Sequence, residues 1–152
     1  MYNCGPTVYD QQHIGNLRGP ILANIMRTTL EAWGHTVQHV SNITDVGHLT
    51  GDNSGDADLG EDRMELGARK QGLTAQEVAK KYTDLFYADL DAVGIDRSRI
   101  TYTPATDYIG EQIALVQTLE EKGYTYQTSD GVYFDTSKFP AYGKLGHINL
   151  GG

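Results

Sequence analysis

The sequence predicts an α/β fold built on a parallel sheet, with a β-hairpin after the last helix. A strand, a helix and a second strand follow one another before residue 44, and this order is the βαβ unit of parallel sheets. A second helix carries a complete capping signal at its start. Two short alternating runs flank Asp130-Gly131, a pair typical of tight hairpin turns.

The βαβ unit begins with a strand in residues 1–9. Apolar residues then recur at spacings of three and four, which predicts an amphipathic helix. These positions are Leu17, Ile21, Leu22, Ile25, Met26, Leu30 and Trp33. Gly34 stands where a helix-terminating glycine belongs. Pro20 is tolerated only in the first turn of a helix, so we expect the regular helix to begin close to it. Residues 37–43 predict the second strand.

A stretch rich in glycine and acidic residues, 47–63, predicts an exposed connecting loop. Its spacing lacks the bidentate glutamate of an EF-hand, so we favour a plain loop over a calcium site. A short helix is expected at about 61–71. The next helix begins at the capping box Thr74-Ala75-Gln76-Glu77 and ends at Gly94. Its buried stripe is expected to contain Val78, Tyr82, Leu85, Phe86 and Val93.

The C-terminal part is expected to begin with a loop or short strand at residues 96–105. A helix follows from about Thr106 to Lys122, and Gly123 ends it. One face of this helix carries Ile109, Ile113, Val116 and Leu119. The hairpin strands are Tyr124–Thr128 and Val132–Asp135. Tyrosines 124, 126 and 133 suit packing on a hairpin face better than stacking on bases.

The charge balance is acidic, with 12 Lys and Arg against 20 Asp and Glu and a net charge of −8. Such a chain lacks the basic footprint of a general nucleic-acid binder, so any RNA partner needs a local basic patch or another part of a larger protein. The apolar runs are too short for a membrane span. Cys4 is the single cysteine, which excludes an internal disulfide and favours a cytoplasmic setting.

The candidate site is Asp10-Gln11-Gln12-His13-Ile14-Gly15-Asn16, between the first strand and the first helix. Ligands of open α/β sheets bind at the carboxyl ends of strands. A helix N-terminus there offers N–H groups and the positive end of a dipole to phosphate. His13 and Asn16 are three residues apart, so both can face one anion, and Gly15 allows a nucleotide close to the backbone.

The order of several stretches resembles the catalytic domain of cysteinyl-tRNA synthetases, which carry a HIGH-type motif at the corresponding place. The matching stretches are Met1–Asp10, His13–Asn16, Asn42–Val46, Gly123-Tyr124, Gly131–Asp135 and Tyr142–Leu145. The resemblance implies the first half of a class I synthetase Rossmann-like nucleotide-binding fold in residues 1–105. It implies the start of a connective insertion, containing the hairpin, in residues 106–152.

The resemblance also implies a function: ATP-dependent activation of cysteine to cysteinyl-adenylate and its transfer to tRNA(Cys), with Mg²⁺ on the phosphates. His13 and Asn16 would be catalytic. The implied ATP-binding residues are Gly5, Pro6, Thr7, Tyr9, Asp10, His13, Ile14, Gly15 and Asn16. Gly5, Thr7 and Thr44 would contact the cysteine substrate. Cys4 would be one zinc ligand, since a soft zinc–thiolate bond separates cysteine from serine, and the remaining ligands are absent from this sequence.

The sequence departs from the family pattern in several places. Gly47-His48-Leu49 replaces an acidic pair and a lysine, and Gly19-Pro20 interrupts the expected helix start. A KMSKS-type loop and anticodon-reading helices have no counterpart in the 152 residues. We therefore expect a fragment of a longer protein, inactive on its own. Of the other histidines, His35 and His39 are expected at the surface, His48 lies in the acidic loop and His147 lies near the end of the sequence. None of the four has metal-ligand spacing to Cys4.

Two other functions fit the same motifs. One is the cysteine-activating ligase of mycothiol synthesis, which shares the cysteine and HIGH-type elements but uses an amino-sugar acceptor. The other is a module that keeps a nucleotide-binding shape without turnover. A pyrophosphate-exchange assay with cysteine separates the module from the two ligases.

Overall fold

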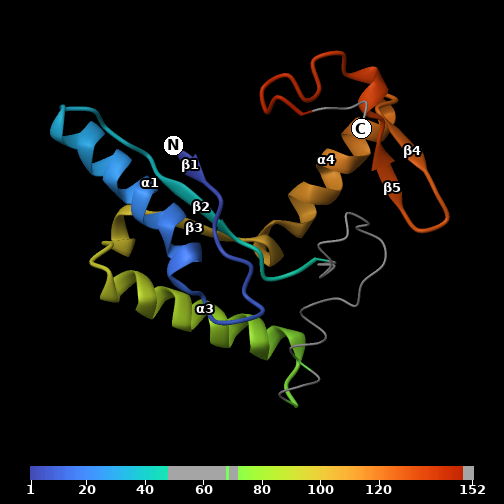
Figure 1. Ribbon diagram of the computed structural model, residues 1–152. Coiled ribbons are helices and arrows are strands. Elements are labelled where there is room, and N and C mark those ends of the chain that lie inside the picture. Colours follow the sequence, from blue (N-terminus) through green and yellow to red (C-terminus); the bar gives the residue numbers. More distant parts are fainter. Residues whose placement is uncertain (48–67, 69–71, 149–152) are drawn as a thin grey trace. The chain divides into compact units, whose positions relative to one another are not determined.

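The computed structural model describes residues 1–47, 68 and 72–148, which form two compact units, Met1–Tyr108 and Ile109–Gly152 (Figure 1). The first unit contains β1 (Tyr2–Asn3), α1 (Ile14–Ala32), β2 (Val40–Ile43), α3 (Ala75–Ala92), β3 (Thr101–Pro104) and two short 3-10 turns, Arg97–Arg99 and Ala105–Tyr108. The second contains α4 (Ile109–Glu121), β4 (Thr125–Gln127), β5 (Val132–Phe134) and a 3-10 turn at Thr136–Lys138. None of the described helices is long and apolar enough to cross a membrane.

The sheet of the first unit is parallel, in the order β1-β2-β3, and the predicted α/β class is confirmed. Val40 pairs with Tyr2 on one side and with Thr101 on the other. The segment expected to be a loop or a short strand is therefore the third strand of the sheet. An isolated parallel bridge between Thr7 and Thr44 extends the β1–β2 pairing past the end of each strand. The carboxyl ends of β1 and β2 thus stay side by side.

Helix α1 begins at Ile14, and the expectation that it would begin close to Pro20 is wrong. Pro20 lies inside the helix, where it has no N–H to donate to the carbonyl of Asn16. The earlier start is explained by a capping box in which His13 is the N-cap and Asn16 the return partner. These residue types are not the usual Ser or Thr with Glu, so the signal is hard to read from sequence. Gly34, at φ +88°, follows the helix as predicted.

The buried face of α1 differs from the predicted stripe. Leu17, Ala23 and Arg27 are its buried residues. Leu22, Ile25, Met26 and Trp33 are exposed in the described unit. Fewer apolar side chains of α1 are therefore buried than the sequence pattern predicts.

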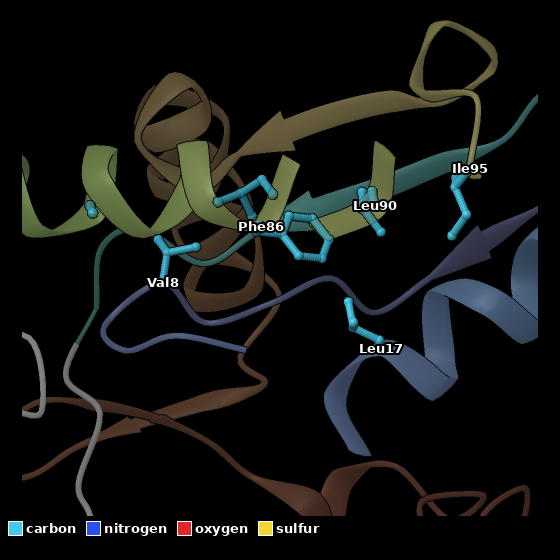
Figure 2. Close-up of a cluster of buried hydrophobic side chains, with 7 residues drawn as sticks. Val8, Leu17, Phe86, Leu90 and Ile95 are labelled. Carbon is cyan, nitrogen blue, oxygen red and sulfur yellow. The ribbon is translucent and has the colours of Figure 1, made fainter. Parts of the chain in front are cut away.

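Helix α3 begins at the predicted capping box, with Thr74 as N-cap and Glu77 as return partner. Val78 and Phe86 are buried as expected, whereas Val93 is exposed and Leu90 takes the buried place near the helix end. Phe86 and Leu90 share one core cluster with Leu17 of α1 and Ile43 of β2 (Figure 2). Both helices therefore cover the same face of the sheet. Val8, Ala79 and Ile95 complete the cluster.

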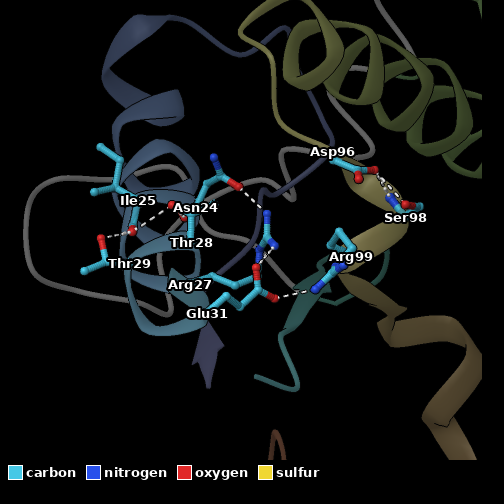
Figure 3. A network of polar contacts seen from close by, with 9 residues as sticks. All are labelled: Asn24, Ile25, Arg27, Thr28, Thr29, Glu31, Asp96, Ser98 and Arg99. Atoms are coloured by element: carbon cyan, nitrogen blue, oxygen red, sulfur yellow. Dashed lines mark hydrogen bonds and ion pairs between the residues drawn. The ribbon is translucent and has the colours of Figure 1, made fainter. Parts of the chain in front are cut away.

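A polar network fastens α1 to the turn that precedes β3 (Figure 3). The buried guanidinium of Arg27 donates to Glu31 at 2.8 Å and to Asn24 at 2.7 Å. Arg99, which lies 68 residues after Glu31, donates to the other oxygen of Glu31 at 2.6 Å. The hydrogen bond from Arg99 and the charges of both arginines hold the pKa of the Glu31 carboxyl below its ordinary value. This carboxylate is therefore shared between two elements of the fold.

In the second unit, the predicted hairpin is present. Strands β4 and β5 are antiparallel, and Tyr126 faces Tyr133 with ring centroids 5.7 Å apart. Gly123 has φ +73° and follows α4, as predicted for a helix-ending glycine. The apolar face expected for α4 is largely exposed within the described residues.

Two predicted segments of the first unit lie outside the described residues. They are the acidic stretch from residue 48 on, which includes His48, and the helix expected at about 61–71, of which only Ala68 is described.

Candidate functional site

A cavity of about 540 Å³ lies where the chain leaves β1 and enters α1. Its lining residues are Cys4, Gly5, Pro6, Thr7, Tyr9, Asp10, Gln11, Gln12, His13, Asn16, Gly19, Pro20 and Phe86. Eight of the predicted site residues thus meet in one place. Ile14, Gly15 and Thr44 are not among the lining residues. The side chain of Ile14 is exposed, and Thr44 adjoins the lining through its backbone bridge to Thr7.

His13 and Asn16 are fixed by the cap that starts α1. The ring Nδ1 of His13 accepts a hydrogen bond from the Gly15 N–H at 3.1 Å, and Oδ1 of Asn16 accepts one from the His13 N–H at 3.1 Å. Because Nδ1 acts as an acceptor, the proton of the neutral ring sits on Nε2. Asn16, with its oxygen engaged, offers its amino group to a ligand. Both side chains therefore present donors.

The start of α1 offers fewer free backbone N–H groups to a ligand than the sequence suggested. The Gly15 N–H is engaged by the His13 ring, and the N–H groups of Asn16 and Leu17 both reach the His13 carbonyl, at 2.9 and 3.2 Å. The helix dipole still favours an anion at this end. The donors left at this end of the helix are mainly the side chains of His13 and Asn16.

The structure gives a reason for a glycine at position 15 that is separate from the predicted approach of a nucleotide. A Cβ at this position would lie 2.8 Å from Cε1 and 3.0 Å from Nδ1 of His13. The ring is folded over the glycine, so a larger residue would displace it from the cap. Gly15 therefore sets the orientation of His13.

Gly5 is pressed against the middle strand of the sheet. A Cβ there would lie 1.6 Å from the backbone oxygen of Asn42, and the Gly5 N–H donates to the Asn42 side chain at 2.9 Å. Two backbone hydrogen bonds continue the contact, from Thr44 N to Pro6 O at 2.9 Å and from Val8 N to Thr44 O at 3.2 Å. The wall of the cavity is thus fastened to the end of β2.

The sequence reasoning named no role for five lining residues: Gln11, Gln12, Gly19, Pro20 and Phe86. Gln12 closes the loop that leads into α1, because its amide Nε2 donates to the carbonyls of Thr7 at 3.4 Å and Asp10 at 3.2 Å. Phe86 reaches the cavity from α3. The sequence alone does not indicate that a glutamine in this stretch contacts the cavity. It also contains no local pattern that predicts a residue of α3 at this site.

The electrostatics of the cavity is unusual for a polyphosphate site. None of the described lining residues is Lys or Arg, and Asp10 carries the one formal charge among them. Its carboxylate accepts a hydrogen bond from the Gln11 N–H at 2.7 Å. A bound nucleotide would therefore need a cation or basic residues from elsewhere to balance its charge.

Cys4 is a free cysteine at an exposed position. In the part of the chain that the structure describes, no group of three or more His, Cys, Asp or Glu side chains could hold a metal ion. A stable zinc site needs three or four protein ligands. The described residues therefore do not fit a zinc ion by themselves.

His39 was expected at the surface, and this expectation is wrong, since the residue is only 2% exposed. Its Nε2 lies 2.6 Å from Oδ1 of Asn3, whose Nδ2 donates to the Cys4 carbonyl at 2.9 Å. Burial lowers the pKa of the His39 ring, and the positive charge of Arg27 lowers it further. His39 is therefore a buried packing residue that contacts β1 through Asn3.

Known proteins match the chain over almost its entire length. A family model described as the catalytic domain of class I (C) tRNA synthetases matches residues 1–151. Cysteine–tRNA ligase 1 of Burkholderia lata is 49% identical over 152 residues, which are 100% of this chain and 31% of that protein. The cysteine–tRNA ligase of Treponema denticola is 45% identical over 150 residues, 99% of this chain and 30% of that protein. The chain thus spans about three-tenths of the length of these curated relatives.

Proposed function

The chain belongs to the family of class I (C) tRNA synthetase catalytic domains, and we propose that the full-length protein is a cysteine–tRNA ligase. Relatives bearing that name support the proposal over the whole length of the chain. The observation that best supports this function is the cap of α1. It leaves Nε2–H of His13 and the amino group of Asn16 as donors, and both residues line one cavity.

The proposed reaction begins with activation of cysteine. A carboxylate oxygen of cysteine bonds to the α-phosphorus of ATP, the bond to the bridging oxygen of the β-phosphate breaks, and pyrophosphate leaves with the electron pair. The carboxylate is already a nucleophile, so no general base is needed. The protein's task is to hold the reactants in line and to stabilise the phosphate charge. A hydroxyl oxygen of tRNA(Cys) then bonds to the carbonyl carbon of the adenylate, the bond from that carbon to the phosphate oxygen breaks, and AMP leaves with the electron pair while the hydroxyl proton is lost.

In this proposal, Nε2–H of His13 and the amino group of Asn16 donate to the phosphates. Gly5, Pro6, Thr7, Tyr9 and Asp10 form the cavity around the nucleotide, together with Ile14 and Gly15 at the start of α1. Gly5, Thr7 and Thr44 contact the cysteine. Mg²⁺ would neutralise phosphate charge that no described lining side chain balances. Zinc at Cys4 is proposed only for the full-length protein, which would have to supply the other ligands, and metal analysis tests it.

The remaining parts of the proposal concern the whole protein. We propose that residues 1–105 are the first half of its nucleotide-binding fold and that residues 106–152 begin a connective insertion. The tRNA would be bound largely by other parts of the protein, since this chain has a net charge of −8. A cytoplasmic location is proposed because translation uses the product.

The test is His13→Asn in the full-length protein. Asparagine is among the best N-cap residues, so the start of α1 is retained while the Nε2–H donor is lost. We expect kcat of cysteine-dependent ATP–pyrophosphate exchange to fall about 10²- to 10³-fold, the usual effect of removing one transition-state donor, with little change in KM for cysteine. His35→Asn, at an exposed position outside the cavity, is the matched control and keeps the wild-type rate.

The outcomes separate the possible functions. Equal losses in kcat and in cysteine binding would make His13 a structural residue. Exchange without tRNA charging, but with transfer of cysteine to an amino sugar, would identify the ligase of the mycothiol type. A full-length protein without cysteine-dependent exchange would be a nucleotide-binding module.

A further inference from the structure

The side chain of Asn42 hydrogen-bonds to three residues around the candidate site. Its Oδ1 accepts hydrogen bonds from the Gly5 N–H at 2.9 Å and from the Tyr2 hydroxyl at 2.8 Å. Its Nδ2 donates to the hydroxyl oxygen of Thr44 at 3.0 Å. The orientation of the amide is fixed, because a backbone N–H can only donate and must therefore face the oxygen.

This orientation determines what Thr44 can do. A hydroxyl has one proton and two lone pairs, and in Thr44 one lone pair is taken by the amino group of Asn42. The hydroxyl proton is then left for another acceptor. A donor at this place suits an acceptor atom of the substrate, such as a carboxylate oxygen.

Asn42 also fixes the segment that carries Cys4 and Thr7. Its backbone carbonyl fills the space where a Cβ of Gly5 would lie, and its side chain holds the Gly5 N–H. The bridge between Thr7 and Thr44 continues this attachment along the cavity wall. One residue thus sets both the position of the wall and the hydrogen-bond direction of the adjacent hydroxyl.

We propose that Asn42 is a positioning residue of the cysteine pocket, which holds Gly5 against β2 and orients the Thr44 hydroxyl as a donor toward the substrate. This inference rests on the proposed function, in which Thr44 contacts the cysteine. It adds a specificity device that acts through Thr44 without contact between Asn42 and the substrate.

The decisive experiment is a double-mutant cycle in the full-length protein, read out by cysteine-dependent pyrophosphate exchange. Asn42→Asp keeps the acceptors for Gly5 and Tyr2 but turns the group next to Thr44 into an acceptor, which draws the hydroxyl proton away from the substrate. We expect KM for cysteine to rise about tenfold, the effect of losing one hydrogen bond, with kcat and KM for ATP nearly unchanged. Thr44→Val should raise KM by a similar factor alone and add little in the Asn42→Asp background.

The matched control is Tyr2→Phe, which removes the hydroxyl donor to Oδ1 of Asn42 and leaves the bonds of Asn42 to Gly5 and Thr44 in place. It should keep the wild-type KM. Equal effects of Thr44→Val in both backgrounds, or a normal KM in Asn42→Asp, would overturn the proposal. If Asn42→Asp does not fold, Thr44→Ser and Thr44→Val decide: the serine must keep KM near the wild-type value and the valine must raise it. Absence of exchange in the wild-type protein would refute the proposed function instead.

Discussion

Replacement of Gly5 by alanine tests how the cavity wall is attached to the sheet. The new Cβ would lie 1.6 Å from the backbone oxygen and 2.8 Å from the carbonyl carbon of Asn42. Real contacts of a Cβ with such atoms essentially never fall below 3.0 Å, so the separation must grow from 1.6 Å to at least that value. Both contacting atoms belong to the backbone, and no rotamer change relieves them. Either β2 or the segment that carries Cys4 has to move.

The expected cost follows from this displacement. Overpacking against a fixed neighbour costs about 1–3 kcal/mol, and loss of the 2.9 Å hydrogen bond from Gly5 to Asn42 adds about 1 kcal/mol. We therefore expect Gly5→Ala to destabilise the fold by about 3 kcal/mol. A shift of about 1 Å in the lining residues should also lower kcat/KM of cysteine-dependent exchange about 100-fold.

Calorimetry and pyrophosphate exchange on the full-length protein measure the two effects. Gly110→Ala is the matched control, because a Cβ at Gly110 would meet nothing within 4 Å and the residue lies in α4, outside the cavity. It should leave the exchange rate unchanged and stabilise the helix slightly, since alanine is a better helix former than glycine. Wild-type stability and activity in Gly5→Ala would refute the assigned contact between Gly5 and β2.

Two further predictions concern the first unit. The lowered pKa of His39 means that the unfolded chain binds more protons than the folded one below the ordinary value of 6.5, so stability should fall as the pH falls from 6.5 toward the folded pKa. The melting temperature of His39→Leu should lose this dependence, whereas His35→Leu, at an exposed position, should keep it; equal slopes in both variants would contradict the assignment. Thr74→Ala removes the acceptor of the 3.2 Å bond from the Glu77 N–H and should cost about 1 kcal/mol of unfolding free energy in denaturant titrations. Thr29→Ala, in the interior of α1, is the control, and equal losses in the two variants would mean that the cap of α3 contributes nothing.

Local signals in the sequence predicted most of the fold. The capping box at Thr74, the glycines after each helix and the alternation around Asp130-Gly131 are each read from a few neighbouring residues, and the structure has all of them. The start of α1 was missed because its cap uses His13 and Asn16 in place of the usual residue types. Burial was harder to predict, since it depends on partners distant in sequence. Leu90, not Val93, is buried in α3 because Leu90 meets the sheet-side cluster.

The site shows the same division between local and distant information. The placement of Asp10–Asn16 between a strand and a helix predicted a site at this point of the chain, and a cavity lies there. Asp10, His13 and Asn16 of that stretch line it, together with five residues that the resemblance implied. The contribution of Phe86 could not be predicted, because it depends on how α3 crosses the start of α1. The burial of His39 was equally invisible, since its partner Asn3 lies 36 residues away.

The contact between Gly5 and Asn42 explains why two stretches about forty residues apart form one structural unit. The glycine is required because the strand carbonyl occupies the space of its side chain, and the asparagine is required because its amide satisfies the Gly5 N–H from the same strand. A substitution at either position therefore changes the environment of the other. The same amide directs the Thr44 hydroxyl, so the wall of the cavity and the adjacent hydroxyl respond together. Selection for binding at this site would then act on Gly5, Asn42 and Thr44 as a set.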